Sequence, residues 1–201
     1  MKSAHLVLSV LALAASAAAS AQTTTYVSSA TFFANVAPGA YTEGFADPFF
    51  SGDPSASFSG GLFSYTVSAP GGLYGNGVLI GTNLPTEALT ITFSGAPVTA
   101  LGGNFWATNI SDVFQPVPVT LTLSDGTVTT FTPSSETVGS FRGFTSAVPI
   151  LSLQITSTAG VYAGMDNFTV GSVVPEPGTW LLMGLGVGAL LLRQSRRAAQ
   201  A

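Results

Sequence analysis

The stretch that decides the fold is residues 117–131, which read VPVTLTLSDGTVTTF. Apolar residues alternate with polar ones from Val117 to Leu123, so one face of this segment is predicted to be buried and the other wet. Asp125-Gly126 comes next, and this dipeptide favours a two-residue type I′ hairpin in which both residues have positive φ. A second strand is expected at 127–132. The stretch therefore predicts an antiparallel hairpin with one buried face.

Similar patterns extend outward from this hairpin in both directions. Only 7% of the residues are charged, and the chain is rich in threonine, serine, glycine, valine and phenylalanine, which favours strands. The sequence predicts an all-β fold: a single two-sheet β-sandwich, jelly-roll-like. A helical turn is expected at 30–36, and loops at 51–61 and 70–77. Strands are expected at 40–46, 62–69, 77–81, 88–94, 98–108, 117–124, 127–132, 138–144, 150–157 and 162–170.

The sandwich domain is predicted to span 22–173 and to follow a secretory leader. Leu6 to Ala15 has the length of a signal-peptide apolar region, and Ala19-Ser20-Ala21 fits the cleavage pattern. We expect 1–21 to be the signal peptide, which makes this an exported protein.

Cleavage at that point limits the chemistry of the domain. His5 and Lys2 are the only histidine and lysine, both lie in the leader, and the chain has no cysteine. This excludes histidine- or cysteine-based nucleophiles, lysine Schiff bases and His/Cys metal sites. Arg142 is the only base in the domain, giving a net charge of −7, which argues against nucleic acid as a partner. The eight acids are Glu43, Asp47, Asp53, Glu87, Asp112, Asp125, Glu136 and Asp166.

Residues 174–197 form a three-part tail. Pro175-Glu176-Pro177 is rigid and extended, because each proline fixes its own φ and restricts the residue before it. The uncharged run 178–192 predicts a transmembrane helix of about 22 Å, against a hydrocarbon core of about 30 Å. Three arginines between 193 and 197 should stay in the cytoplasm by the positive-inside rule. An ordinary single-span anchor remains an alternative.

The order of these three parts closely resembles the PEP-CTERM sorting signal. The resemblance implies recognition of Pro175, Glu176 and Pro177 by exosortase, a membrane protease of Gram-negative bacteria that make extracellular polysaccharide. It also implies export across the inner membrane, anchoring there through the C-terminal helix before processing, and a final site at the cell surface or in the extracellular matrix.

Two acidic residues are candidate metal ligands. Glu43 lies in an early expected strand, and Asp166 shares strand parity with Phe168 and Val170, which places its carboxylate on the apolar side. A carboxylate there needs a partner, and Ca²⁺ accepts carboxylate and carbonyl oxygens. The pair also loosely resembles the structural calcium site of carbohydrate-binding-module jelly rolls. The alternative is that Asp166 bonds backbone amides at a strand end.

Two aromatic residues are candidate ligand contacts. Trp106 and Tyr74 lie in or beside expected loops, where sugar rings stack on aromatic faces. The alternative is that they belong to the core.

The sequence thus predicts a secreted, non-catalytic surface or matrix protein that is sorted through its C-terminal signal, with polysaccharide as the candidate ligand. Two alternatives stay open. One is a glycan-active enzyme that uses two carboxylates. The other is a membrane-retained structural protein without a ligand.

Overall fold

The computed structural model describes residues 23–46 and 49–175. Among them no helix is long and apolar enough to cross a membrane. The leader predicted at 1–21 and the span predicted at 178–192 lie outside the described residues. One helix, α2 (Ser29–Phe33), overlaps the helical turn predicted at 30–36. The strands are β1 (Thr24–Tyr26), β2 (Tyr41–Glu43), β3 (Phe49–Gly60), β4 (Phe63–Asn76), β5 (Ile80–Thr82), β6 (Leu89–Gly95), β7 (Ala100–Thr108), β8 (Phe114–Gln115), β9 (Val119–Leu123), β10 (Val128–Phe131), β11 (Phe141–Thr145), β12 (Ser152–Ser157) and β13 (Tyr162–Gly171).

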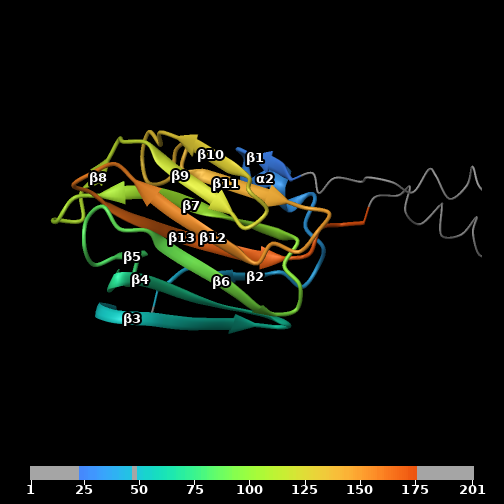
Figure 1. Cartoon of the computed structure of the whole chain (residues 1–201). Helices are drawn as coiled ribbons and strands as arrows, with labels where there is room; N and C mark the ends of the chain where they lie inside the picture. The colour runs from blue at the N-terminus through green and yellow to red at the C-terminus, as the bar shows by residue number, and fades with distance from the viewer. Residues whose placement is uncertain (1–22, 47–48, 176–201) are drawn as a thin grey trace, which may run out of the picture.

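The all-β prediction is confirmed, and every strand pair is antiparallel. Hydrogen bonds connect all thirteen strands into one sheet, in the order β1-β11-β7-β13-β5-β4-β6-β12-β9-β10, with β2 on β13, β3 on β4 and β8 on β7. The sheet curls over so that β6, β12 and β9 cover β13 and β7 (Figure 1). We call the part from β1 to β13 the first half and the part from β4 to β10 the second half.

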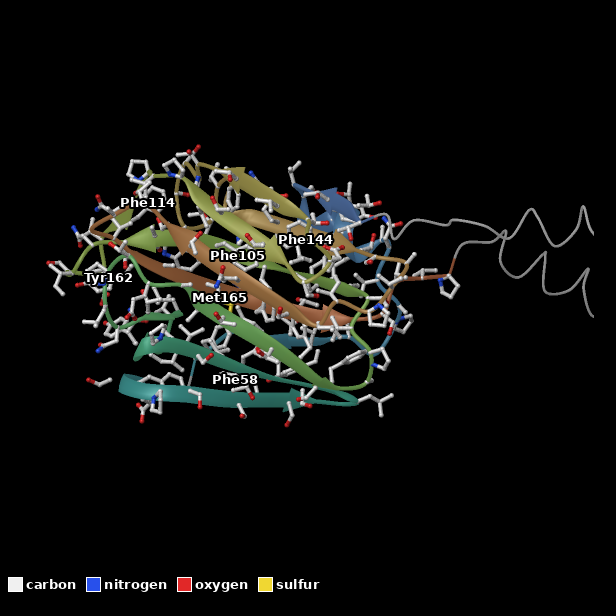
Figure 2. The ribbon with its side chains drawn as sticks, viewed as in Figure 1. Phe58, Phe105, Phe114, Phe144, Tyr162 and Met165 are labelled. Atoms are coloured by element: carbon white, nitrogen blue, oxygen red, sulfur yellow. The ribbon has the colours of Figure 1, made fainter. Side chains whose placement is uncertain are left out.

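The core lies between the two halves. Phe168 of β13 stacks on Phe93 of β6 with 6.3 Å between ring centroids, although these two strands share no hydrogen bonds. Tyr65 of β4 meets the edge of Phe168 at 5.2 Å. Figure 2 shows Phe105 and Met165 in this interior, and both are fully buried. Apolar residues at every second position of the strands supply this core, as the alternation in the sequence predicts.

The prediction of two separate sheets differs from the structure, because β5 joins the halves. This short strand pairs with β13 on one side and with β4 on the other. Gly81 sits in register with Gly164 of β13, where an added Cβ would lie 2.6 Å from the Ala163 carbonyl oxygen. A larger residue would hold the strands apart. A three-residue strand centred on glycine has little apolar pattern, so the sequence does not predict this connection.

The loops predicted at 51–61 and 70–77 are also corrected, since they form much of the long β3–β4 hairpin. The register shifts twice between Ser51 and Ser55, around Gly52 and Pro54. Proline is tolerated there because β3 is an edge strand that pairs only with β4. Residues 51–55 are exposed, so β3 carries no strong apolar alternation to mark it as a strand.

A further correction concerns the hairpin from which the fold was predicted. β9 and β10 pair as expected, with Val119 opposite Phe131. The connection, however, is a three-residue loop in which only Gly126 has positive φ, at 90°. The Gly126 amide donates to the Leu123 carbonyl and the Leu123 amide to the Thr127 carbonyl, which is a turn followed by a bulge. The Asp125 carboxylate accepts the Thr127 amide at 2.8 Å and so stabilises this turn.

Strand β13 runs between the two ends of the domain. It spans ten residues, from Tyr162 to Gly171, or about 30 Å at about 3.3 Å per residue. Beyond Gly171 the chain is held by the Val36–Val173 bridge and by the Val174 amide, which donates to the Asn35 carbonyl at 2.9 Å. The described chain leaves the domain at the right of Figure 1, whereas Tyr162 lies at the left of Figure 2.

Candidate functional site

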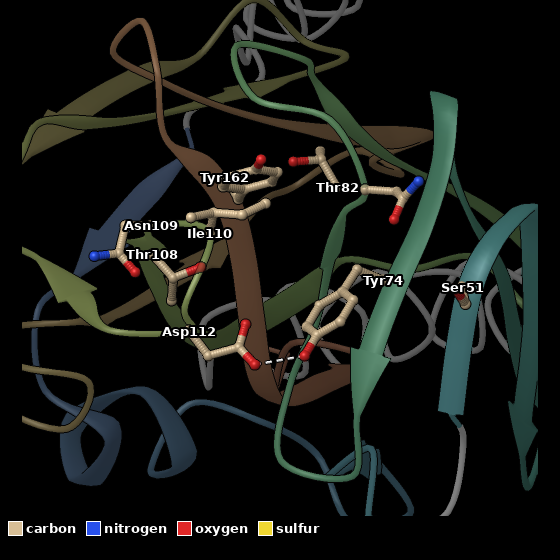
Figure 3. A pocket seen from close by; sticks show the side chains of 9 residues that line it. Ser51, Tyr74, Thr82, Thr108, Asn109, Ile110, Asp112 and Tyr162 are labelled. Carbon is tan, nitrogen blue, oxygen red and sulfur yellow. Dashed lines mark hydrogen bonds between the residues drawn. The ribbon is translucent and has the colours of Figure 1, made fainter.

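A pocket of about 210 Å³ opens at the Tyr162 end of the fold (Figure 3). Its lining comes from β3, β4, β5 and the residue after it, the end of β7, β13, and the segment that joins β7 to β8. Eight of the nine lining residues carry hydroxyl, amide or carboxylate groups, and Ile110 is the ninth. The arrangement therefore suits a ligand with many hydrogen-bonding groups.

One wall of the pocket is a tyrosine held by a carboxylate. The Tyr74 hydroxyl donates to Asp112 Oδ2 at 2.5 Å, and Asn76 Nδ2 lies 3.5 Å from the same oxygen. The hydrogen bond to Asp112 raises the pKa of Tyr74 above its usual value. Asp112 adopts a positive φ of 59°, a conformation that aspartate tolerates better than most residues. The contact therefore fixes the Tyr74 ring between β4 and the β7–β8 loop.

That loop is ordered by its own side chains. Asn109 Oδ1 accepts the backbone amides of Ser111 and Val113 at 2.9 and 3.1 Å. The Asn109 amide in turn donates to the Val113 carbonyl at 3.0 Å. Asparagine is a common turn residue because it can hydrogen-bond the backbone two residues on. Asp112 is thus presented to Tyr74 by a loop with a defined shape.

A buried hydroxyl lines the pocket on β5, the strand that pairs with β4 beside Tyr74. Thr82, the last residue of β5, is 1% exposed, and its Oγ1 has no hydrogen-bond partner among the described residues. Its side chain projects toward Tyr162 in Figure 3. A buried hydroxyl without a partner costs about 1–3 kcal/mol, so such groups are uncommon and need an explanation. Thr108, 4% exposed, lies in the same lining.

The structure separates the two aromatic candidates from the sequence. Tyr74 lies in the pocket wall, and its role in ligand binding stays a prediction. Trp106 is 2% exposed within β7, opposite Gly164 of β13. An indole buried there has no open face on which a sugar ring could stack. Its location agrees with the core alternative, because sequence position beside a loop does not reveal which side of a strand a residue faces.

The two predicted calcium ligands lie on strands that pair with each other, Glu43 on β2 and Asp166 on β13. Burial is the main reason why the pKa of Asp166 is raised, and the Glu43 charge raises it further, while the hydrogen bond from the Asn167 amide opposes both. Glu43 pairs in register with Phe168, just beyond a β-bulge between Asp166 and Thr169.

Local groups already bond to both carboxylates. Glu43 accepts the Tyr41 hydroxyl and, at 3.0 Å, the Phe45 amide. Asp166 accepts the backbone amide of Asn167 at 2.6 Å and its side-chain amide at 2.7 Å. Among the described residues no three acidic, histidine or cysteine side chains gather as a metal cluster. Calcium at this site therefore stays a prediction.

Sequence reasoning missed most of the pocket. Thr82, Thr108, Asp112 and Tyr162 come from segments spread over eighty residues, and none belongs to a recognisable motif. A local signal that could have been used is the Asn-x-Ser-Asp sequence at 109–112, which is typical of a turn. What makes these residues a site is the closure of β5 against β13, which brings the β7–β8 loop beside Tyr74.

The pocket contains one carboxylate, that of Asp112, among its described lining residues. Glycoside hydrolysis ordinarily requires two carboxyl groups on opposite sides of the bond that is cleaved. Histidine, lysine and cysteine are also absent from the described lining. What the described geometry offers is hydrogen bonding and aromatic contact.

Comparison with curated proteins finds no match, and comparison with solved structures finds none either. The resemblance of the domain to carbohydrate-binding modules therefore stays a prediction. A family model described as the PEP-CTERM protein-sorting motif matches residues 173–197. This match confirms the resemblance of the tail, and it covers all three of its parts. The chain carries a PEP-CTERM sorting motif at the C-terminal end of its β-domain.

Proposed function

We propose that this is a non-catalytic cell-surface protein whose β-domain binds extracellular polysaccharide in the pocket between Tyr74 and Tyr162. The sorting motif implies processing by exosortase and delivery to the cell surface. The observation that carries the binding proposal is the chemistry of the pocket: eight polar lining residues, two of them tyrosines, around about 210 Å³. Tyrosine combines an apolar ring with a polar hydroxyl, as a sugar combines apolar C–H faces with hydroxyls.

The position of the pocket supports the same proposal. It lies at the Tyr162 end of β13, and the sorting motif begins just beyond the other end of that strand. While the tail holds the domain at a membrane, an opening at the far end is free to meet polymers outside the cell. After removal of the tail, the pocket is unaffected, because its described lining includes no residue after Tyr162.

The non-catalytic part of the proposal rests on the single carboxylate. Asp112 already accepts the Tyr74 hydroxyl at 2.5 Å, and the described lining holds no second acid to act as nucleophile or base. Incubation of the purified full chain with polysaccharide should therefore release no new reducing ends. Release that is lost in Asp112→Asn would overturn this part.

Sorting is tested in the native host. The chain should reach the cell surface without its tail, and Glu176→Ala should leave an unprocessed form in the membrane. Detection of only full-length chain in the envelope, with no processed form, would contradict the sorting proposal.

Binding is tested by co-sedimentation of the purified full chain with polysaccharide extracted from the same cells. Tyr74→Ala should reduce binding, because it removes the ring from the pocket wall. Tyr26→Ala is the matched control, since Tyr26 is also half-buried but lies in β1, outside the pocket. Equal loss in both variants, or no binding by the unchanged protein, would refute this function.

A further inference from the structure

We propose that the pocket holds one uncharged sugar unit, at a chain end or a branch, and that the Thr82 hydroxyl is its buried recognition group. This inference rests on the proposed polysaccharide binding and names the class of sugar and the residue that selects it. It follows from the size of the pocket, the charges around it and the unpaired hydroxyl in its wall.

Size favours a single unit. Pockets for drug-sized ligands measure about 300–1,000 Å³, and this pocket holds about 210 Å³. The neighbouring strands β4, β5 and β13 line it, and the Tyr74–Asp112 hydrogen bond joins the β7–β8 loop to β4 at its edge. A terminal or branching unit can enter such a hollow, whereas the middle of a polymer would need an open path on both sides.

Charge favours an uncharged unit. Asp112 is the only charged residue in the described lining. Arg142, the one base of the domain, lies elsewhere, with its guanidinium carbon 3.7 Å from the centre of the Phe131 ring. A uronate or a sulfated sugar would find no cation in the pocket and would face the Asp112 carboxylate, which is costly for a charge removed from water. An amino sugar gains little, because Asp112 is exposed and solvent weakens its attraction for an ammonium group.

The Thr82 hydroxyl supplies the selectivity. A hydroxyl both donates and accepts a hydrogen bond, and so does each hydroxyl of a sugar. The Thr82 Oγ1 is covered and has no partner among the described residues. Thr82 lines the pocket, and its side chain projects toward Tyr162, so a sugar hydroxyl seated beside Tyr162 can reach it (Figure 3). A ligand hydroxyl then satisfies a group that is unsatisfied in the free protein, and a sugar that lacks this hydroxyl leaves it unpaired.

The test uses Thr82→Val in the full chain, with Thr82→Ser as the matched control. Valine keeps the shape of threonine and its preference for strands but has no hydroxyl. Thr82→Val should melt at or above the temperature of the unchanged protein, because it removes an unpaired buried group. It should bind polysaccharide about three- to tenfold more weakly, the expected loss for one neutral hydrogen bond. Thr82→Ser should restore binding.

Competition by monosaccharides identifies the class. Uncharged hexoses or pentoses should displace the polysaccharide, while uronic acids and amino sugars at equal concentration should not. Polysaccharide binding that is unchanged in Thr82→Val, or stronger competition by a charged sugar, would overturn this inference and leave the proposed function standing. Absence of polysaccharide binding by the unchanged protein would overturn both.

Discussion

Replacement of Tyr65 by phenylalanine should make the protein more stable. Tyr65 is 1% exposed in the core, and its hydroxyl has no hydrogen-bond partner among the described residues. Its ring stacks on Phe58 at 5.4 Å and meets the edge of Phe168 at 5.2 Å. Burial raises the pKa of Tyr65 above its usual range, and the nearby Tyr41 and Glu43 raise it further. The Tyr65 ring therefore stabilises the folded state through its contacts, whereas its buried, unpaired hydroxyl lowers the free energy of unfolding.

The size of the effect follows from that hydroxyl alone. Tyr65→Phe keeps both ring contacts and removes a buried polar group whose unsatisfied state costs about 1–3 kcal/mol. For a domain of this size, 1 kcal/mol shifts the melting temperature by about 2–4 °C. The expected rise is therefore about 2–12 °C, measured by calorimetry on the purified full chain.

Tyr41→Phe is the matched control, because it removes a hydroxyl that does have a partner. The Tyr41 hydroxyl donates to Glu43, so its loss should lower the melting temperature. A lower melting temperature for Tyr65→Phe would refute the reasoning, since it would show that the Tyr65 hydroxyl is satisfied in solution. In that case, the first partner to test for would be a cation bound by both the Tyr65 hydroxyl and Glu43.

Three further predictions follow from the structure. In urea titration, Gly72→Ala should lower the free energy of unfolding by about 1–3 kcal/mol more than Gly126→Ala. The angle φ is near 90° at both glycines, but only at Gly72 would an added Cβ lie 2.6 Å from the Gly52 backbone. Equal losses of stability in the two variants would contradict this. Burial and the bond to Glu43 raise the pKa of Tyr41 to about 12, so stability should hold below pH 10 and fall as the pH rises from 10 through 12; Tyr41→Phe should weaken that fall. If the predicted calcium site forms, calcium should stabilise the folded protein, relative to chelator, by about 2.7 kcal/mol when free calcium is at a hundredfold excess over Kd. Identical melting curves in calcium and in chelator would exclude the site.

Strands with one buried face could be predicted from the sequence, and strands without one could not. β9 and β12 lie within the predicted strands at 117–124 and 150–157, and β6 overlaps the one at 88–94. β3 was missed because its backbone pairs with β4 while most of its side chains stay in solvent. In such an edge strand, main-chain hydrogen bonds provide the pairing, and these bonds do not require particular residue types.

The candidate site was less predictable for a related reason. Tyr74 could be identified because an aromatic residue near a glycine-rich segment is a local signal. Thr82 could not, because a threonine at the end of a strand is ordinary until its surroundings are known. Its unpaired hydroxyl results from the packing of β5 between β4 and β13, which depends on residues distant in sequence.

The end of β13 explains how a domain can survive loss of the segment that sorts it. The Ala37 amide donates to the Ser172 carbonyl at 2.8 Å, and the Thr99 amide to the Gly171 carbonyl at 3.0 Å. The Val173 amide donates to Thr99 Oγ1 at 2.9 Å. These bonds close the strand before the Pro-Glu-Pro sequence begins. Because proline has no N–H to donate, Pro175 cannot continue such pairing through its own amide. Cleavage on its C-terminal side therefore breaks none of these contacts, and the pocket at the other end of the strand keeps its shape.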